Sequence, residues 1–234
     1  MKAAVFCSEA PTLSRAKLLD FVTLTKPRIA VLVLFTVAAG VVLASGTAVD
    51  LLLMLHTVLG TALVAGGASA LNQFIERNSD AQMKRTSQRP LPANRLQPAE
   101  VFVFGLTLGV GGVIYLAVAL QQVWAPMIAV LTFLIYVAVY TPLKSVTTLN
   151  TLIGAVPGAM PPVIGWVAAR GKIDPGAVVL FLIVLVWQIP HFLAIAWIYR
   201  EDYGKAGLKM LPVVDPKGGR TGWCMVGFAA MLIP

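Results

Sequence analysis

Charged residues are scarce in this chain: only 12% of its 234 residues are Asp, Glu, Lys or Arg, whereas 58% are hydrophobic. A soluble domain carries about 25% charged residues and about 45–50% apolar ones. So few charges cannot cover a water-facing surface, which excludes a soluble two-domain enzyme and a disordered chain. The composition therefore predicts an integral membrane protein.

Cysteine and histidine are also rare, with two residues of each. Cys7 and Cys224 lie far apart and have no histidine or further cysteine at metal-ligand spacing, which argues against a zinc site and a disulfide scaffold. The formal net charge of +8 does not indicate nucleic-acid binding, because no basic soluble segment with interleaved aromatic residues is present. In a multi-pass membrane protein such an excess is typical of topology-setting loops.

Long uncharged runs dominate the chain, and a membrane-spanning helix needs about 20 apolar residues. The run at 101–143 is too long for one helix, and Gln121-Gln122 followed by Pro126 predicts a hairpin between helices at 101–120 and 124–141. The other runs are Ile29–Val49, Leu51–Ile75, Ser145–Ala169, Pro175–Tyr199 and Thr221–Pro234. We therefore expect an all-α polytopic transmembrane helix bundle with six complete spans. The short last run predicts either a partial seventh span in a chain that is incomplete at its C-terminus, which we favour, or a re-entrant segment.

The basic residues indicate the orientation of this bundle. If the N-terminus is cytoplasmic, the inside segments hold 16 of the 18 Lys and Arg residues, and the outside turns hold only Arg170 and Lys172. This asymmetry predicts an N-terminus on the cytoplasmic side. We expect the membrane to be the inner membrane of a bacterium. We expect residues 1–20 to form a loose cytoplasmic arm and residues 21–234 to form one membrane-embedded domain.

The first inside loop begins with a polar stripe. Asn72, Glu76 and Asp80 are spaced four residues apart, so on a helix they lie on one face. Two acids at this spacing repel each other, but a bound divalent cation would reverse the effect, and these oxygen ligands suit Mg²⁺. The alternative is a set of interfacial polar residues in which Arg77 neutralises Asp80.

Basic residues follow the stripe directly. Arg85 and Arg89 are also four residues apart, and their guanidinium groups match the oxygens of a diphosphate or of a carboxylate such as a porphyrin propionate. Such a dense mixture of acids and bases at a membrane face favours a site for a metal and a diphosphate. The alternative is the positive charge that any inside loop carries.

The second inside loop repeats this mixture in the segment from Tyr199 to Lys205. Neighbouring helical residues point about 100° apart, so Glu201 and Asp202 cannot serve one ion equally. We favour Asp202 as the residue that faces the site, although the sequence leaves both open.

Several motifs together resemble a known family. The entry segment Leu24–Arg28 and the run from Asn72 to Leu91 are similar to motifs of the UbiA-type intramembrane prenyltransferases. The further motifs are Tyr140–Lys144, Gly154–Trp166, Pro190–Tyr203 and Met210–Val213. The resemblance covers residues 21–215, and the Met83–Leu91 and His191 segments are similar to the protohaem IX farnesyltransferase branch. The chain has Glu76 where many members of the family carry an aspartate, and Asn78 where some carry a further acid. The family has nine membrane helices.

The resemblance implies an activity and a set of site residues. The expected reaction joins the farnesyl group of farnesyl diphosphate to the 2-vinyl group of protohaem IX (haem b), with addition of water, to give haem o and diphosphate. Mg²⁺ is the expected cofactor, with Asn72, Glu76, Asp80 and Asp202 as ligands, and haem is a substrate. The expected catalytic residues are Asn72, Glu76, Asp80, Arg85, Arg89 and Asp202. The expected substrate-binding residues are Lys26, Arg28, Lys144, His191, Tyr199, Glu201, Tyr203 and Lys205. Haem a synthase or a terminal oxidase assembly are the expected partners, beside the lipid bilayer.

The two histidines have different expected roles. His56 lies in the middle of the second span, where a structural hydrogen bond is the expected role. His191 follows Pro190 in the sixth span, where its imidazole suits either a contact with haem or a hydrogen bond to a carbonyl that the proline leaves free. Small residues near Gly67 in the second span predict close packing between helices.

Two other functions stay open from the sequence. The first is a UbiA-type prenyltransferase with another acceptor, such as a quinone precursor or chlorophyllide. The second is a transporter or channel, which would spread its polar residues through the depth of the bilayer. Here the polar residues gather at one face of the membrane, which favours an enzyme.

Overall fold

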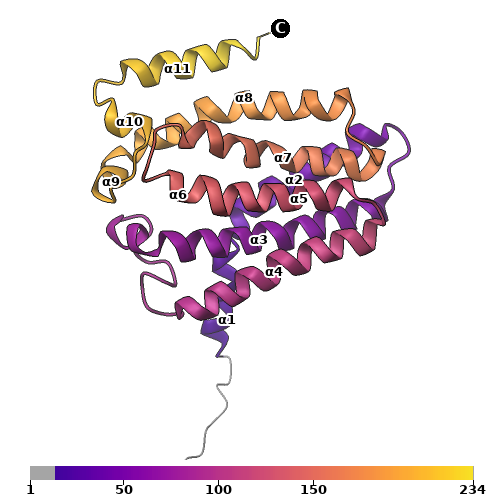
Figure 1. The fold of residues 1–234 in the computed structure, drawn as a ribbon, viewed down its shortest axis with the longest axis horizontal. Coiled ribbons are helices and arrows are strands. Elements are labelled where there is room, and N and C mark those ends of the chain that lie inside the picture. The colour runs from indigo at the N-terminus through magenta and orange to yellow at the C-terminus, as the bar shows by residue number, and fades with distance from the viewer. Residues whose placement is uncertain (1–13, 234) are drawn as a thin grey trace, which may run out of the picture.

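The computed structural model describes residues 14–233, and these residues form helices without any strand. Figure 1 shows the long helices side by side in one bundle. In chain order, the elements are α1 (Arg15–Leu24), α2 (Pro27–Ser45), α3 (Leu51–Gln82), α4 (Pro98–Leu120), α5 (Trp124–Leu134), the π-helix η1 (Ile135–Tyr140), α6 (Thr141–Leu143), α7 (Asn150–Arg170), α8 (Pro175–Ile198), α9 (Arg200–Lys205), α10 (Leu211–Val214) and α11 (Gly219–Ala230).

Six of these helical segments in the described residues are long and apolar enough to cross a membrane, as the sequence predicts. The fourth span is composed of α5, η1 and α6 in succession. The predicted hairpin is present, because α4 ends at Leu120 and α5 begins at Trp124, with Gln121 in the left-handed conformation. Helix α11 occupies the run in which we expected a partial seventh span.

Two boundaries differ from the sequence prediction in ways that affect the site. Helix α3 continues to Gln82, beyond the expected end at Ile75, so Glu76 and Asp80 are both helical. Helix α7 begins only at Asn150, because residues 145–149 form turns that lead into it. The longer α3 keeps the polar stripe on one continuous helix.

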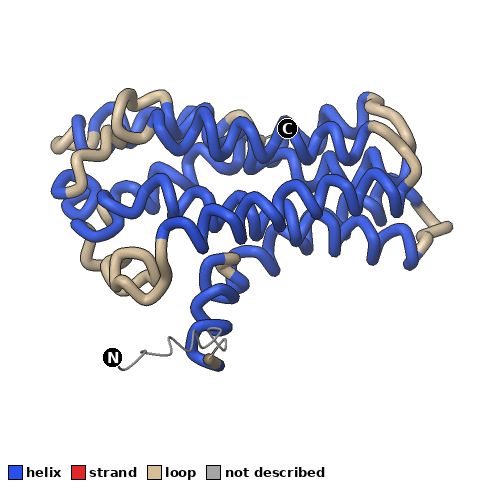
Figure 2. The backbone as a smooth tube through the Cα atoms, turned by 60° about the horizontal axis from the view of Figure 1, so that its bottom comes forward, coloured by secondary structure: helices blue, strands red, loops and turns tan. Residues whose placement is uncertain are grey.

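Most of the expected N-terminal arm lies outside the described residues. Its last six residues are helical, because Arg15–Leu24 forms α1, which stands off the bundle in Figure 2. The end of α1 is anchored to α3: Ser69 Oγ and Gln73 Nε2 both donate hydrogen bonds of 2.8 Å to the carbonyl oxygen of Leu24. Leu24 itself is fully buried. This anchor holds the start of α2 against α3.

Helices α3 and α4 pack closely through glycine, as the small residues of the second span predict. A Cβ atom added to Gly67 would lie 2.5 Å from the carbonyl oxygen of Gly105 and 2.5 Å from the amide nitrogen of Gly109. Both neighbours are backbone atoms, so no side chain can move aside to make room. Gly67 therefore permits the contact between the two helices.

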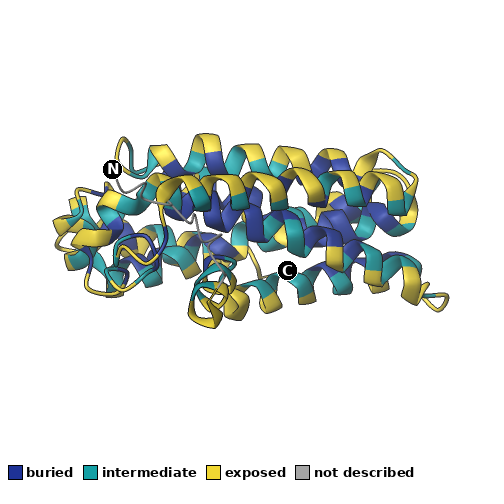
Figure 3. Cartoon of the chain, turned by 90° about the horizontal axis from the view of Figure 1, so that it is seen from below, coloured by how far each residue is buried: buried dark blue, intermediate teal, exposed yellow. Residues whose placement is uncertain are grey.

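Helix α7 occupies the centre of the bundle. It is the most buried of the six spans, since 61% of its most apolar 18-residue stretch is buried inside the protein. It packs against α2, α5 and α8, and the burial colours of Figure 3 show the buried residues between the outer helices. Three prolines lie inside α7, at Pro157, Pro161 and Pro162. Neighbouring helices compensate for such interruptions in a membrane bundle.

The connections separate into two ends of the bundle. Figure 1 shows the segments that join α3 to α4 and α6 to α7, together with α9 and α10, at one end. The joins between α2 and α3, α4 and α5, and α7 and α8 lie at the opposite end. The two polar segments that the sequence singles out, after α3 and after α8, therefore share one end, which we call the polar end.

Candidate functional site

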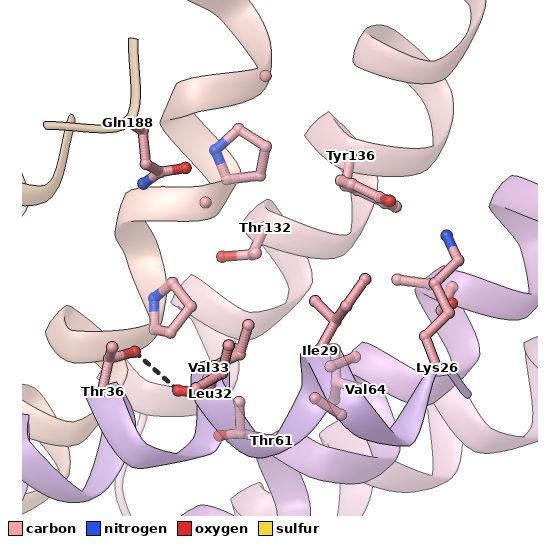
Figure 4. A pocket seen from close by; sticks show the side chains of 18 of the residues that line it. Lys26, Ile29, Leu32, Val33, Thr36, Thr61, Val64, Thr132, Tyr136 and Gln188 are labelled. Carbon is pink, nitrogen blue, oxygen red and sulfur yellow. Dashed lines mark hydrogen bonds between the residues drawn. The ribbon is translucent and has the colours of Figure 1, made fainter. Parts of the chain in front are cut away.

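A cavity of about 490 Å³ lies between α2, α3, α5, η1, α7 and α8. Its walls are mostly apolar, and Figure 4 shows Ile29, Leu32 and Val64 among the side chains that line it. Lys26 and Tyr136 also line the cavity and mark its junction with the polar residues of α3. The cavity thus combines an apolar interior with a charged mouth.

Asn72 is the centre of a hydrogen-bond chain at this junction. Lys26 Nζ donates to Asn72 Oδ1 at 3.1 Å, and Asn72 Nδ2 donates to Thr141 Oγ1 at 3.1 Å. The Thr141 hydroxyl donates in turn to the carbonyl oxygen of Tyr136 at 2.8 Å. Asn72 is only 1% exposed, so this chain fixes the orientation of its amide.

Glu76 lies one turn further along α3 and is paired with a lysine. Lys144 Nζ lies 2.6 Å from Glu76 Oε1, and both side chains are largely buried. The same ammonium group lies 4.6 Å from the centre of the Tyr140 ring. Burial opposes the charge on Lys144, but Tyr140 and Glu76 outweigh it and raise the pKa of Lys144 above its usual value. This lysine therefore stays charged.

Asp80 completes the stripe and is paired on one side only. Arg89 Nη1 donates to Asp80 Oδ2 at 2.6 Å, while Oδ1 is buried and has no hydrogen-bond partner among the described residues. The Thr86 hydroxyl donates to the backbone carbonyl of Asp80 at 2.8 Å, which ties the following loop to the end of α3. A buried carboxylate oxygen without a partner is costly unless a ligand or metal satisfies it.

Lys26 lies at the mouth of the cavity and has a strongly lowered pKa. It precedes α2, adopts the left-handed conformation with a φ of 50° and directs its ammonium group towards α3. Burial first, and then the positive charges of Arg89 and Lys144, lower the pKa of Lys26 to about 7, although Glu76 and Asp80 act in the opposite direction. The ammonium group can therefore lose its proton near neutral pH.

The π-helix η1 brings aromatic residues to the same place. Pro142 has no N–H with which to continue an α-helical ladder, and Thr141 bonds instead to the carbonyl of Tyr136. The rings of Tyr136 and Tyr140 lie 5.5 Å apart, and both line the cavity. Short π-helices are frequent at functional sites.

Sequence reasoning missed Tyr136, Tyr140 and Thr141 as site residues. The signal was present, because Tyr140 and Thr141 belong to the segment Tyr140–Lys144 that the resemblance includes. The sequence indicates only Lys144 of this segment, because a charged residue is more distinct from its apolar neighbours than an aromatic ring is.

The segment after α8 contacts the loop after α3 through Arg85. Its guanidinium carbon lies 4.7 Å from the centre of the Tyr199 ring, and Nη2 is 3.4 Å from the hydroxyl of Tyr203. Arg85 therefore joins the loop after α3 to α9, instead of contacting the stripe on α3. Burial raises the pKa of Tyr203, so its hydroxyl stays protonated.

The structure does not bring every predicted residue to the mouth of the cavity. Arg28, Glu201 and Lys205 are exposed, and Asp202 is half-buried on α9. Within residues 14–233, no three Asp, Glu, His or Cys side chains converge as a metal-binding group, so Asp202 does not complete one with the acids of α3. The roles of these four residues stay predictions.

The residues of α3 have the donor chemistry that Mg²⁺ prefers, with an amide oxygen from Asn72 and carboxylates from Glu76 and Asp80. The buried Oδ1 of Asp80, which has no partner in the described part of the chain, fits a metal ligand best. Each of the three residues contacts a cation in this structure, namely Lys26, Lys144 or Arg89.

The two histidines occupy different environments. His191 lines the cavity and stacks on Trp187, with ring centres 4.9 Å apart and planes inclined by 14°. His56 Nδ1 lies 2.7 Å from the hydroxyl of Tyr115, which confirms the expected structural hydrogen bond. Only His191 of the two is placed where it can meet a ligand in the cavity.

Residues 33–234 match the sequence profile of the UbiA prenyltransferase family. The chain is 46% identical over 218 residues to the protoheme IX farnesyltransferase of Salinibacter ruber, and 43% identical over 224 residues to that of Solibacter usitatus. Each alignment covers 92% of this chain and 76% of the relative.

Solved structures show the same fold at lower sequence identity. A UbiA homologue from Archaeoglobus fulgidus bound to GPP and Mg²⁺ matches 91% of this chain and 75% of its own, with a TM-score of 0.73 and 18% identity. The apo structure of a UbiA homologue from Aeropyrum pernix K1 matches 88% of this chain and 76% of its own, with a TM-score of 0.71 and 18% identity.

Proposed function

The chain belongs to the UbiA prenyltransferase family, and we propose that it transfers the farnesyl group of farnesyl diphosphate to protohaem IX. The two relatives described above carry the name of this activity, and they share more than 40% of aligned residues with this chain. The observation that carries the proposal is the junction between the apolar cavity and the polar stripe of α3. One site there can accept both ends of a prenyl diphosphate.

The donor would bind with its diphosphate at the mouth of the cavity. Lys26, Arg89 and Lys144 come from three different segments, and each contacts a residue of the stripe. Three cations at this point supply the charge that a diphosphate needs, both on binding and when it leaves. The farnesyl chain would then extend into the apolar cavity.

Mg²⁺ would be held by Asn72, Glu76 and Asp80, and by Asp202 if α9 approaches the stripe. Bound there, it would neutralise the diphosphate and favour its departure. Binding of the ion requires the paired cations to leave the carboxylates and turn towards the phosphate oxygens. Before the substrate arrives, the ion pairs with Lys144 and Arg89 would thus neutralise Glu76 and Asp80.

The apolar walls would protect the reaction once the C1–O bond breaks. The electron pair leaves with the diphosphate, and the allylic cation stays in a cavity that limits premature attack by water. The vinyl group of protohaem IX would then attack C1 of the farnesyl group. Tyr136 and Tyr140 line this cavity, and an aromatic ring can offer negative electrostatic potential to a cation.

The acceptor would lie against α8. His191 enters the cavity from that helix and can contact the haem iron or its porphyrin ring, with Trp187 supporting the imidazole by stacking. Arg85, Tyr199 and Tyr203 would border the polar end, where Arg28, Glu201 and Lys205 are also available to the substrates. These assignments are part of the proposal.

The protein would lie in the inner membrane of a bacterium, with its polar end on the cytoplasmic side. This orientation places 16 of the 18 Lys and Arg residues, and the N-terminus, on the inside. The haem o produced would pass to haem a synthase or to the assembly of a terminal oxidase.

The test is the haem content of cells that lack their own haem o synthase and express this chain. Mass spectrometry of the extracted haems is expected to show haem o, and the relative from Salinibacter ruber serves as the positive control. If the relative yields haem o while this chain, present in the membrane, yields none, the proposal is overturned. A prenylated quinone precursor or chlorophyllide in place of haem o would assign another acceptor.

A further inference from the structure

Helix α1 is fixed to the protein by charged side chains on one of its faces. Lys17 Nζ lies 2.5 Å from Oε1 of Glu100, in the first turn of α4. Arg95, in the loop before α4, donates from Nε to Asp20 Oδ1 at 2.9 Å. Lys17 and Asp20 are three residues apart, so they share one face of α1, which we call the charged face. Because the start of α4 and the loop before it belong to the polar end, the charged face is directed towards that end.

The opposite face of α1 is apolar and exposed. Leu18, Leu19 and Val22 have the spacing of one helical stripe, and they are 56%, 58% and 48% exposed. At about 100° per residue, this apolar stripe lies on the side of the helix opposite to the charged face. Water is an unfavourable environment for three large apolar side chains that lie side by side. The apolar stripe therefore needs a partner that is itself apolar.

The level of α1 along the bundle follows from its contact with α3. The carbonyl oxygen of Leu24 accepts hydrogen bonds from the side chains of Ser69 and Gln73. Ser69 lies 18 residues and Gln73 22 residues after Leu51, the first residue of α3, which corresponds to about 27 and about 33 Å along the axis. The hydrocarbon core of a bilayer is about 30 Å thick. When the start of α3 lies at one boundary of the hydrocarbon, the end of α1 therefore lies at the other.

Helix α4 gives the same level independently. Glu100, the partner of Lys17, lies 20 residues before Leu120, the last residue of α4, which corresponds to about 30 Å. Leu120 lies at the end of the bundle opposite to the polar end, as the start of α3 does. Val103 and Leu106 of α4, about one and two turns beyond Glu100, are exposed apolar residues. The surface of α4 that suits lipid therefore begins at the level of α1.

Helix α1 runs across the axis of the bundle. Figures 1 and 2 both show it standing off the long helices, with only its end inside the bundle. The chain changes direction at Lys26, whose left-handed backbone with a φ of 50° leads into α2. A helix at this level and in this direction lies in the plane of the membrane surface. Its charged face then points towards the polar end, and its apolar stripe points towards the hydrocarbon.

We propose that the apolar stripe of α1 docks on the lipid bilayer, at the boundary between headgroups and acyl chains on the side of the polar end. An amphipathic helix in this position buries its apolar face about 5–10 Å into the boundary region. This position differs from the loose cytoplasmic arm that the sequence predicts for residues 1–20, since residues 15–20 belong to α1. The inference goes beyond the proposed function and does not depend on it, because the partner is lipid and no reaction is involved.

Nitroxide spin labels on single cysteines test this position. Cys7→Ser and Cys224→Ser remove the natural cysteines, and Leu19→Cys then carries the label in vesicles of phosphatidylcholine and phosphatidylglycerol. Collisions of the label with oxygen, which dissolves in lipid, and with a nickel chelate, which stays in water, measure its depth below the lipid phosphates. We expect the label to lie about 5–10 Å below the phosphates. Val22→Cys repeats the measurement one turn away on the same stripe, so the result does not depend on one variant.

Two further positions calibrate the depth. Gln88→Cys is in the exposed loop after α3, and its label is expected to collide with the nickel chelate as freely as in water. Val110→Cys on α4 lies ten residues beyond Glu100, about 15 Å deeper, and its label is expected to meet oxygen and not the chelate.

The orientation of α1 is tested with labels beside the apolar stripe. Ala16 and Thr23 are exposed on the flank of the helix, so labels at Ala16→Cys and Thr23→Cys should lie about 5 Å nearer to the water than the label at Leu19→Cys. Equal depth at all three positions would contradict a fixed face of α1. A Leu19→Cys label that meets the chelate as freely as the Gln88→Cys label would overturn the proposal. Protection from both reagents would also overturn it, because another segment or a second copy of the chain would then cover the stripe.

Discussion

Arg89 pairs with only one oxygen of Asp80: its Nη1 lies 2.6 Å from Oδ2, and Oδ1 has no hydrogen-bond partner in the described residues. The side chain of Asp80 is 1% exposed, so the free oxygen is directed into the protein. A buried carboxylate oxygen without a partner is costly, so this half-paired state supports the proposal that Asp80 binds a ligand.

We expect Asp80→Asn to lower the rate of farnesyl transfer by about 100-fold or more, because an amide cannot neutralise Arg89 or hold a divalent cation equally well. Haem o formation by the purified protein in vesicles measures this. Asp50→Asn is the matched control, since Asp50 caps the opposite end of α3 and Asn can cap a helix equally well. Full activity of Asp80→Asn would remove Asp80 from the proposed site.

The lowered pKa of Lys26 leads us to expect that substrate binding depends on pH. Its pKa is lowered to about 7, chiefly by burial, so below this pH the ammonium form attracts a diphosphate and above it the neutral form does not. The affinity for farnesyl diphosphate should therefore fall about tenfold between about pH 6 and about pH 8. Titration calorimetry in vesicles measures this change.

Lys26→Arg separates this effect from the titration of the substrate. A guanidinium group stays charged over the whole range, so the variant should lose the tenfold decline while retaining the smaller change that comes from the diphosphate itself. An identical pH profile in both proteins would show that another group is responsible.

Because His191 lines the cavity, we expect its replacement to change the absorption spectrum of bound haem b. We expect His191→Gln to weaken the binding of haem b about tenfold and to alter its absorption band, because the imidazole that lines the cavity is lost. His56→Gln is the control, since His56 is bonded to Tyr115 and does not line the cavity. Identical haem spectra for both variants would argue that the acceptor binds elsewhere.

The contact between α3 and α4 leaves no room for a side chain at Gly67. Gly67→Ala should lower the free energy of unfolding by about 1–3 kcal/mol, because its Cβ would collide with the backbone at Gly105 and Gly109. Gly111→Ala on α4 should be neutral or stabilising, since a Cβ there meets nothing within 4 Å. Thermal unfolding in detergent compares the two variants, and equal midpoints would contradict the close packing.

Much of the fold could be predicted from the sequence because its signals are local. The length of an apolar run determines whether a helix can cross a membrane, and the predicted hairpin at Gln121 follows from two adjacent polar residues. The spacing of Asn72, Glu76 and Asp80 placed them on one helical face, which α3 confirms. The exact ends of the helices are harder to predict. Helix α3 continues through polar residues to Gln82, which is further than a helix needs to extend to cross the membrane.

The partners of these residues could not be predicted, because they come from segments far apart in the chain. Nothing in the pattern indicates that Lys26 bonds to Asn72, that Lys144 pairs with Glu76, or that Arg85 contacts Tyr199 away from the stripe.

The sequence by itself thus determined a membrane bundle of six spans with most of its charged residues at one end, since hydrophobic length and helical period act over neighbouring residues. Only the tertiary structure decided which cation neutralises which acid, and only the packing of α2, α3, α5, α7 and α8 formed the apolar cavity beside them. The reason is physical: the free energy of a buried polar atom depends on what distant helices bring to it, and no local pattern records that.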